Sequence, residues 1–319
     1  MNRAVLWTLA LVAALTSSPA AAQSLSGKKV LFVNSYHEGY AWSDGEEAGA
    51  ASVLKASGVE MRTVRMDAKR QPGDKAIKEA GLKVKALIES YRPDVVITAD
   101  DIATQVLVRD YKNVSLPWVF CGVNWDASHY GLPFKNATGM IEVALLDKLF
   151  QNLKGYAKGT RLGFLTADTE TERTEQQAYR KQLKIPFAKE KLVKTFADWK
   201  AAFRSMQGEV DALFLGNFAG INDWNEAEAA AWALEHGKIP SGAMYDFMMP
   251  YAMLGMTKIP EEQGIWAAKT ALAILRGQSP GAIPIVANKE AKLFANVKLA
   301  SKAGIVFKPE LVSSAQILK

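Results

Sequence analysis

The stretch SYHEGYAW, residues 35–42, brings hydroxyl, imidazole, carboxyl and aromatic groups together in one short segment. It comes directly after the apolar run from Val30 to Val33. The Ser35 hydroxyl, with helix N-terminal N–H groups nearby, is suited to holding an anionic group such as a carboxylate. The rings of Tyr36 and Trp42 are suited to stacking on a flat or apolar moiety. These side chains predict noncovalent ligand recognition.

Side chains of the same kinds follow other apolar runs of the chain. They are Asp100 and Asp101; Gly122 and Asn124; Thr166 and Asp168; Asn217; and Tyr245 and Asp246. Aspartates can pair with an ammonium group, Thr166 can add a hydroxyl, and asparagines can both donate and accept. Together with Ser35, Tyr36 and Trp42, they form our predicted set of ligand-binding residues.

Each of these residues also has a purely structural interpretation. Asp100 and Asp101 can cap the helix that follows them, and Asp168 with Thr169 can do the same. Trp42 can pack its helix onto the sheet. For the loop 35–42 we favour the ligand role, because it holds so many polar and aromatic groups of the kind usually found at the surface.

Catalytic and metal-binding patterns are missing from the sequence. The three histidines, His37, His129 and His236, are dispersed and show neither HExxH nor HxH spacing. The single cysteine, Cys121, has no obvious base and lies in an apolar segment, where we expect a buried small hydrophobe. A carboxylate pair at Asp100 and Asp101 is a weak signal, because adjacent acids are common at strand ends. We therefore predict no enzyme activity, no catalytic residue, no metal and no cofactor.

The charge of the chain favours no nucleic-acid partner. A formal charge of +6 over 319 residues comes from Lys and Arg scattered among Asp and Glu, without a basic run. Such a surplus mainly affects solubility. We expect a monomer that binds a small-molecule solute.

The first 22 residues have the features of a cleaved signal peptide. Arg3 supplies the positive charge, Ala4 to Leu15 the apolar segment, and the alanines at 20–22 a cleavage site. Neither a twin arginine nor a lipid-anchoring cysteine is present near this site. We expect export and a soluble periplasmic protein.

Strand-like and helix-like segments alternate along the rest of the chain. The apolar runs are short, continuous and rich in β-branched residues, as strands buried on both faces should be. One series of four runs ends near residue 124, and a second series covers 160–247. This predicts an α/β protein of two Rossmann-like lobes with parallel sheets.

We expect three crossovers between the lobes, near 138–143, 248–256 and 280–288. The N-terminal lobe should comprise 23–140 plus about 251–285, and the C-terminal lobe 141–250 plus about 286–319. Ligands of open parallel sheets bind beyond the carboxyl ends of the strands, so the predicted residues should line one cleft between the lobes.

Four segments, taken in their order and spacing, resemble one protein family. They are VNSYHEGYAWSDG, VVITADD, PWVFCGVN and the closing AAKTALAILRGQSPGAIPIVAN with ANVKLASKAGIVFKPELV. They resemble the periplasmic substrate-binding proteins of ABC-type transporters of uncharacterised substrate, and also related sensor domains of histidine kinases. The resemblance covers nearly the whole chain after the signal.

The resemblance implies a type I periplasmic-binding-protein architecture with a cleft that closes by a hinge. It assigns 35–36, 100–101 and 122–124 to the first wall, and 166–168, Asn217 and 245–246 to the second. Family members with an assigned ligand are similar to amino-acid binders. The implied function is delivery of a small polar solute, an amino acid or related carboxylate, to a membrane permease. The alternative is ligand sensing with a membrane histidine kinase, which requires the same cleft.

Overall fold

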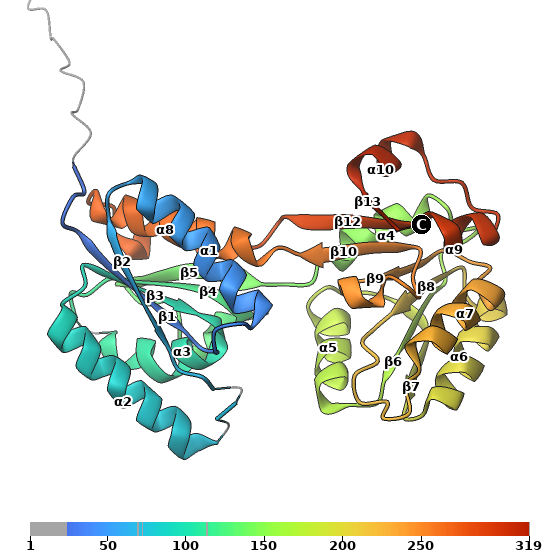
Figure 1. Ribbon diagram of the computed structural model, residues 1–319, viewed down its shortest axis with the longest axis horizontal. Coiled ribbons are helices and arrows are strands. Elements are labelled where there is room, and N and C mark those ends of the chain that lie inside the picture. Colours follow the sequence, from blue (N-terminus) through green and yellow to red (C-terminus); the bar gives the residue numbers. More distant parts are fainter. Residues whose placement is uncertain (1–23, 69, 72, 113, 319) are drawn as a thin grey trace, which may run out of the picture.

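The computed structural model describes residues 24–318 except 69, 72 and 113. The predicted signal peptide at 1–22 lies outside the described residues. The chain forms two lobes, each built on its own sheet, and extended segments connect them (Figure 1). Among the described residues, no helix has the length and apolarity needed to cross a bilayer.

The sheet of the first lobe is entirely parallel. Its order is β11-β5-β4-β3-β1-β2. The strands are β1 (Lys29–Asn34), β2 (Glu60–Arg65), β3 (Val95–Ala99), β4 (Trp118–Asn124), β5 (Ala137–Glu142) and β11 (Val286–Ala287). All residues of β3 are buried, and so are nearly all of β1 and β4. This burial explains why these strands read as continuous apolar runs.

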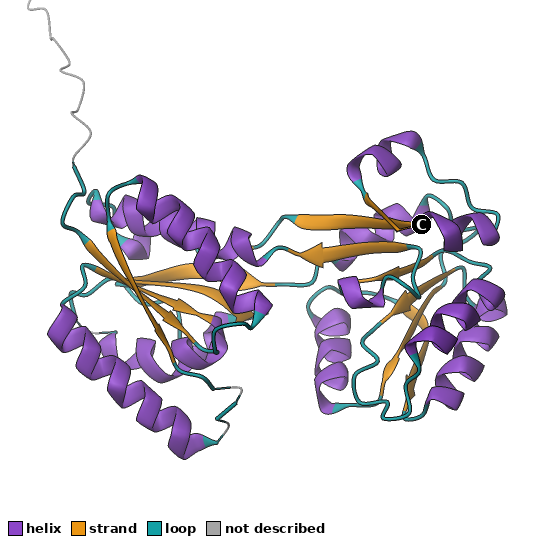
Figure 2. Ribbon diagram, viewed as in Figure 1, coloured by secondary structure: helices purple, strands orange, loops and turns teal. Residues whose placement is uncertain are grey.

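Helices cover both faces of this sheet (Figure 2). They are α1 (Ala41–Ala56), α2 (Asp74–Tyr91), α3 (Asp100–Leu107) and α8 (Pro260–Leu275). Successive residues of a strand point to opposite faces. Accordingly, Val30 and Phe32 pack with residues of α1 and α8, whereas Leu31 and Val33 pack with residues of α2 and α3. Cys121 is buried in the first of these two cores, as predicted.

The sheet of the second lobe has the order β13-β12-β10-β9-β8-β6-β7. The strands are β6 (Leu162–Ala167), β7 (Phe187–Val193), β8 (Ala212–Leu215), β9 (Ser241–Ala243), β10 (Leu254–Lys258), β12 (Ala291–Asn296) and β13 (Gln316–Leu318). Its helices are α4 (Leu146–Lys154), α5 (Glu170–Lys181), α6 (Phe196–Glu209), α7 (Glu226–His236), α9 (Val297–Lys302) and α10 (Pro309–Ser314).

The second sheet is not wholly parallel, contrary to our expectation. β12 pairs with β10 in the antiparallel sense, and β13 runs parallel to β12. The reason is the path of the chain: β10 leads out of the second lobe, and β12 brings the chain back from the first lobe beside it (Figure 1).

The first crossing falls in the range that the sequence indicates, and the other two occur later in the chain. β5 stays in the first sheet to Glu142, so the first crossing follows that residue. β10 pairs within the second sheet, so residues 254–258 belong to the second lobe rather than to the first, and the chain crosses at Ile259. β11 pairs with β5, which places 286–287 in the first lobe and the third crossing at 288–290. Pairing with a distant strand, and not local sequence, decides to which lobe each of these strands belongs.

Helices α1 and α8 pack unusually closely because glycines face the contact. A Cβ on Gly264 would lie 1.8 Å from the Glu46 carbonyl oxygen, and a Cβ on Gly49 would lie 2.4 Å from that of Glu261. Both obstacles are backbone atoms, which cannot turn away as a side chain can. The contact positions the first turns of α1, which carry Trp42 and Glu46.

We predict that Gly264→Ala lowers the free energy of unfolding by about 1–3 kcal/mol or more, because the helices must separate to admit the methyl group. The matched control is Gly208→Ala in α6, where an added Cβ would meet nothing within 4 Å. That control should be neutral or stabilising by up to about 1 kcal/mol, because alanine favours helix. Urea denaturation measures both, and equal effects would contradict the packing argument.

Candidate functional site

The strand order creates a crevice at one edge of the first sheet. β1 lies between β2 and β3, so the connections after β1 and after β3 leave toward opposite faces and separate. Tyr36 follows β1, and Asp100 begins α3 directly after β3. The polar residues at the ends of these two strands therefore border the same opening.

The second sheet repeats this arrangement. β6 lies between β7 and β8, and β9 follows β8 in the sheet. Asn217 comes after the end of β8, and Tyr245 comes after the end of β9. Both residues lie at the carboxyl edge of the second sheet, where such sheets bind ligands.

A cavity of about 610 Å³ is lined by residues of both lobes. It contains seven of the predicted site residues: Tyr36, Trp42, Asp100, Asn124, Asn217, Tyr245 and Asp246. It is also lined by residues outside the predicted set, among them Tyr40, Glu142, Glu175, Met244, Phe247, Thr257 and Lys258. We refer to this cavity as the interlobe cleft.

Aromatic rings form part of both walls of the interlobe cleft. On the first lobe the rings of Tyr36 and Tyr40 meet edge to face with centroids 5.3 Å apart. On the second lobe the rings of Tyr245 and Phe247 stack with centroids 5.1 Å apart. Phe247 is 46% exposed. Exposed aromatic faces at a cavity are suited to holding a flat or cationic group.

The side chain of Asp100 is held in place at the first-lobe side of the interlobe cleft. Its backbone has φ 68°, a left-handed conformation that non-glycine residues seldom adopt, and its side chain is buried. Its carboxylate accepts hydrogen bonds from Trp42 Nε1 and from Ser43 Oγ, both at 3.1 Å. Trp42 therefore orients the acid as well as lining the cleft. Backbone strain of this kind often marks a functional position.

Glu46 is a second acid behind Asp100 that the sequence analysis missed. It is fully buried, next to Asp100 and Trp42. Burial, together with the negative charges of Asp100 and Glu142, raises the pKa of Glu46 well above its ordinary value. At neutral pH the carboxyl therefore tends to retain its proton. The signal in the sequence was its spacing, since Glu46 lies one helical turn after Trp42.

Gly122 makes room for these two acids without lining the cleft. It has φ 66°, and a Cβ there would lie 2.3 Å from Glu46 Oε1 and 3.0 Å from Asp100 Oδ1. Its N–H donates to Gln263 Oε1 at 3.0 Å. Its contribution to the site is the absence of a side chain.

Glu142 and Lys258 form an ion pair between the two strands that lead out of the lobes. Glu142 ends β5 and Lys258 ends β10. Burial lowers the pKa of Lys258, but the charge and hydrogen bond of Glu142 outweigh it and the net pKa is raised. Lys258 therefore stays protonated, and its ammonium is already paired.

The charges of the interlobe cleft are mostly negative. Four carboxyl groups line it, those of Asp100, Glu142, Glu175 and Asp246. Among the described residues that line it, Lys258 is the only base. The cleft is thus an acidic site with aromatic walls.

Ser35 does not lie in the cleft, which corrects our expectation that it holds a ligand carboxylate. It is fully buried. Its hydroxyl donates to the Ala99 carbonyl at 2.6 Å and accepts from the Ala103 N–H at 2.8 Å. The residue joins the end of β1 to the start of α3, and so positions the neighbouring Tyr36 and Asp100.

Asp101 and Thr166 also contact protein groups and do not line the cleft. Asp101 accepts from Asn124 Nδ2 at 2.6 Å and from the Tyr130 hydroxyl at 2.8 Å. Thr166 is buried and donates to the carboxyl of Glu172. Both residues support the loops that carry Asn124 and Asn217.

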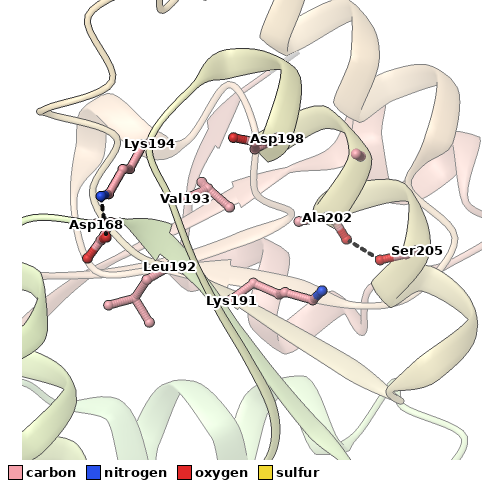
Figure 3. A pocket seen from close by; sticks show the side chains of 9 residues that line it. Asp168, Lys191, Leu192, Val193, Lys194, Asp198, Ala202 and Ser205 are labelled. Carbon is pink, nitrogen blue, oxygen red and sulfur yellow. Dashed lines mark hydrogen bonds and ion pairs between the residues drawn. The ribbon is translucent and has the colours of Figure 1, made fainter.

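Asp168 lies at a different hollow, which is lined by residues of β7 and α6 (Figure 3). Arg173 Nε donates to it at 2.6 Å, and Lys194 Nζ lies 3.8 Å away. Thr169, not Asp168, caps α5, because its side chain accepts the Glu172 N–H. The structure thus separates Asp168 from the other predicted residues.

Trp125 connects the two lobes at the side of the cleft. It follows β4 of the first lobe with φ 60°. Its Nε1 donates to Glu175 Oε1 at 3.3 Å, and its ring meets that of Tyr179 at 5.9 Å. Both partners belong to α5 of the second lobe. Trp125 therefore packs against the core of the second lobe, although it belongs to the first.

We predict that Ser35→Ala lowers the free energy of unfolding by about 1–3 kcal/mol, because it leaves the buried Ala103 N–H without its acceptor. Ser205→Ala is the matched control. Ser205 is exposed and its hydroxyl donates only to the Ala202 carbonyl of its own helix. Its replacement should change stability by less than about 0.5 kcal/mol. Chemical denaturation distinguishes the two, and an unchanged stability of Ser35→Ala would refute the structural role.

We predict a pH effect that depends on Glu46. Because folding raises the pKa of this acid, the folded state binds more protons than the unfolded state once the pH exceeds the ordinary value of 4.5. The contribution of Glu46 to stability therefore falls as the pH rises above that value. Glu46→Gln should reduce the loss of stability between about pH 5 and about pH 8. Denaturation of both proteins at the two pH values measures this, and identical pH profiles would contradict it.

The chain is similar to a known protein family and to several solved structures. The family model described as ABC transporter substrate binding protein matches residues 42–319. No curated protein sequence matches the chain significantly. Among solved structures, a ligand-free, open substrate binding protein with adhesive properties from Clostridium difficile matches with a TM-score of 0.70 at 16% identity. That match covers 92% of this chain and 99% of the other.

Two further structures share the fold at similar coverage. The ABC domain from Streptococcus pneumonia in complex with L-Trp has a TM-score of 0.54 at 15% identity, over 90% of this chain and 99% of that one. A periplasmic ribose ABC transporter structure from Conexibacter woesei has a TM-score of 0.55 at 13% identity, over 90% and 98%. These matches confirm the predicted type I periplasmic-binding fold.

The family match covers most of the chain, from Trp42 at the cleft to the C-terminal residue. Proteins of this family are non-enzymatic components of transport systems, in agreement with our prediction of no catalytic activity. The chain belongs to the ABC transporter substrate binding protein family.

Proposed function

We propose that this protein is a periplasmic receptor that closes on a small polar solute carrying an amine, an amino acid in the first instance, and delivers it to an ABC permease. The observation that carries the proposal is the interlobe cleft, whose lining comes from both lobes. Its volume of about 610 Å³ lies within the roughly 300–1,000 Å³ that small-molecule sites occupy.

The side chains of the cleft support an amine-bearing ligand. Asp100 and Asp246 are suited to an ammonium group, and the rings of Tyr36 and Tyr245 to an apolar or aromatic part of the solute. A carboxylate without an amine finds less support, since the base Lys258 is already paired with Glu142. The pneumococcal relative in complex with L-Trp adds support for an amino acid.

Closure of the lobes would bring the two walls onto the ligand. The chain crosses between the lobes directly after β5 and β10, so a hinge there would move Tyr245 and Asp246 relative to Tyr36 and Asp100. Ligand binding would shift the population toward the closed form, which the permease recognises. A sensory role would use the same closure, and membership of a transport family favours delivery.

The predicted signal peptide supports a periplasmic location, and solute-binding proteins of ABC transporters act outside the cytoplasm. We propose that the receptor works as a monomer with a membrane permease as its partner. No nucleic-acid partner is proposed, because positive charge is not gathered in the sequence.

We predict that a solute panel identifies a ligand by thermal shift. The mature protein is first unfolded and refolded to remove bound solute, and then mixed with amino acids, small carboxylates, polyamines, sugars and nucleosides. A ligand at about 100 times its dissociation constant should stabilise the fold by about 2.7 kcal/mol. The control is Tyr245→Ala, which should retain the fold and lose most of the shift. A refolded protein that responds to none of these solutes would contradict the proposed function.

A further inference from the structure

We propose that the interlobe cleft selects solutes with a net positive charge, that is, organic amines or guanidines whose charge no carboxylate balances. This inference rests on the proposed solute-binding function and specifies its substrate class. It would place basic amino acids and decarboxylated amines above ordinary zwitterionic amino acids as ligands.

The lining of the interlobe cleft carries more acidic than basic groups. Four carboxyl groups face one base, so the formal balance is 4 − 1 = 3 negative charges when all of these groups are ionised. The acids come from both lobes, Asp100 and Glu142 from the first and Glu175 and Asp246 from the second. Closure would bring these like charges closer together, and a cation between them would offset their repulsion.

The positive charge of Lys258 is already paired with the carboxylate of Glu142. Its ammonium is bound by the nearly buried Glu142. A ligand carboxylate would have to displace that partner, and would then lie among the remaining acids of the cleft. Separating a buried ion pair is costly, because it leaves one charge uncompensated.

The interlobe cleft already binds one ammonium in the proposed manner, that of Lys258. Lys258 Nζ lies 5.5 Å from the centroid of the Trp42 ring while it pairs with Glu142. An aromatic face and a carboxylate therefore hold the protein's own cation. Asp100 with Tyr36, and Asp246 with Tyr245, offer a ligand the same combination of groups at the same cavity.

The tyrosines add no negative charge to the site. Burial, and secondarily the charge of Asp100, raises the pKa of Tyr36, and burial together with Glu172 raises the pKa of Tyr245. Both hydroxyls stay protonated at neutral pH. They can accept a hydrogen bond from an amine while their rings attract its charge.

The test uses two matched series that differ in charge more than in shape. One comprises tryptamine, L-tryptophan and indole-3-propionate, and the other cadaverine, L-lysine and 6-aminohexanoate. Isothermal titration calorimetry is done on the refolded mature protein. Within the series that fits the cleft, we expect affinity to fall by about tenfold or more for each unit decrease in the net charge of the ligand, and to weaken with added salt. Tightest binding of the zwitterion or of the anion would overturn the inference.

Two variants connect the selectivity to the acids. Glu175→Gln should weaken binding of the best cation by about tenfold, and the more exposed Asp246→Asn by about fivefold. Both should affect the zwitterion of the same series less. Glu235→Gln is the matched control, because Glu235 lies on α7, is 72% exposed and does not line the cleft. Equal losses for cation and zwitterion, or a loss in the control, would overturn the role of these charges.

The outcomes separate this inference from the proposed function. Binding of a neutral sugar or a carboxylate, with no response to the cations, would refute the charge selectivity and leave the receptor function standing. Absence of binding by both series and by the broad panel, with the protein folded, would refute both.

Discussion

Parallel strand pairing is the constraint on which the site depends. Two neighbouring parallel strands can be connected only by a chain segment that crosses back over a face of the sheet. The loops that follow the carboxyl ends of the strands therefore all lie at the same edge of the sheet. In each lobe one early strand, β1 or β6, lies between the next two strands along the chain. The loops after the central strands therefore separate and leave a crevice. The two crevices face each other and form one cavity. Its lining combines residues of the two lobes that are more than a hundred positions apart in the sequence, such as Tyr36 and Tyr245.

The acidic groups of the cleft are held at a cost to stability. Glu46 and Asp100 are buried side by side behind Gly122, and burial raises the pKa of Glu46. Trp42 and Ser43 supply part of the compensation, by donating to Asp100. A protein selected for stability alone would hold apolar residues there. Their presence at the cavity is consistent with the common finding that unfavourable charges collect at functional sites.

The crossing strands combine a mechanical and a chemical role. Glu142 and Lys258 are the last residues of β5 and β10, directly before the chain passes between the lobes. Their ion pair ties the two strands together and also lies in the cleft lining. Trp125 adds a separate contact between the lobes, through Glu175. Groups that line the cleft are therefore next to the segments that would bend on the proposed closure.

The sequence by itself determined the elements and the edge at which the site lies. Continuous apolar runs marked the buried strands, and the polar residues that follow them predicted Tyr36, Asp100, Asn124, Asn217 and Tyr245, all of which line the cleft. These predictions rest on local rules, because burial on both faces and the position after a strand are visible in a short segment. The crossover boundaries were less accurate, because the pairing of β10 with β9 and of β11 with β5, which assigns each strand to its lobe, joins segments that are distant in the sequence.

Only the tertiary structure decided which of these side chains face the cavity. Ser35 and Asp168 follow strands just as Tyr36 and Asn217 do. Yet Ser35 is enclosed by backbone groups of β3 and α3, and Asp168 is paired with Arg173 and Lys194 at another hollow. Conversely, Glu142, Glu175 and Lys258 reach the cleft from three separate elements. The direction of a side chain and the charge it meets depend on contacts between distant segments, which spacing along the chain does not encode.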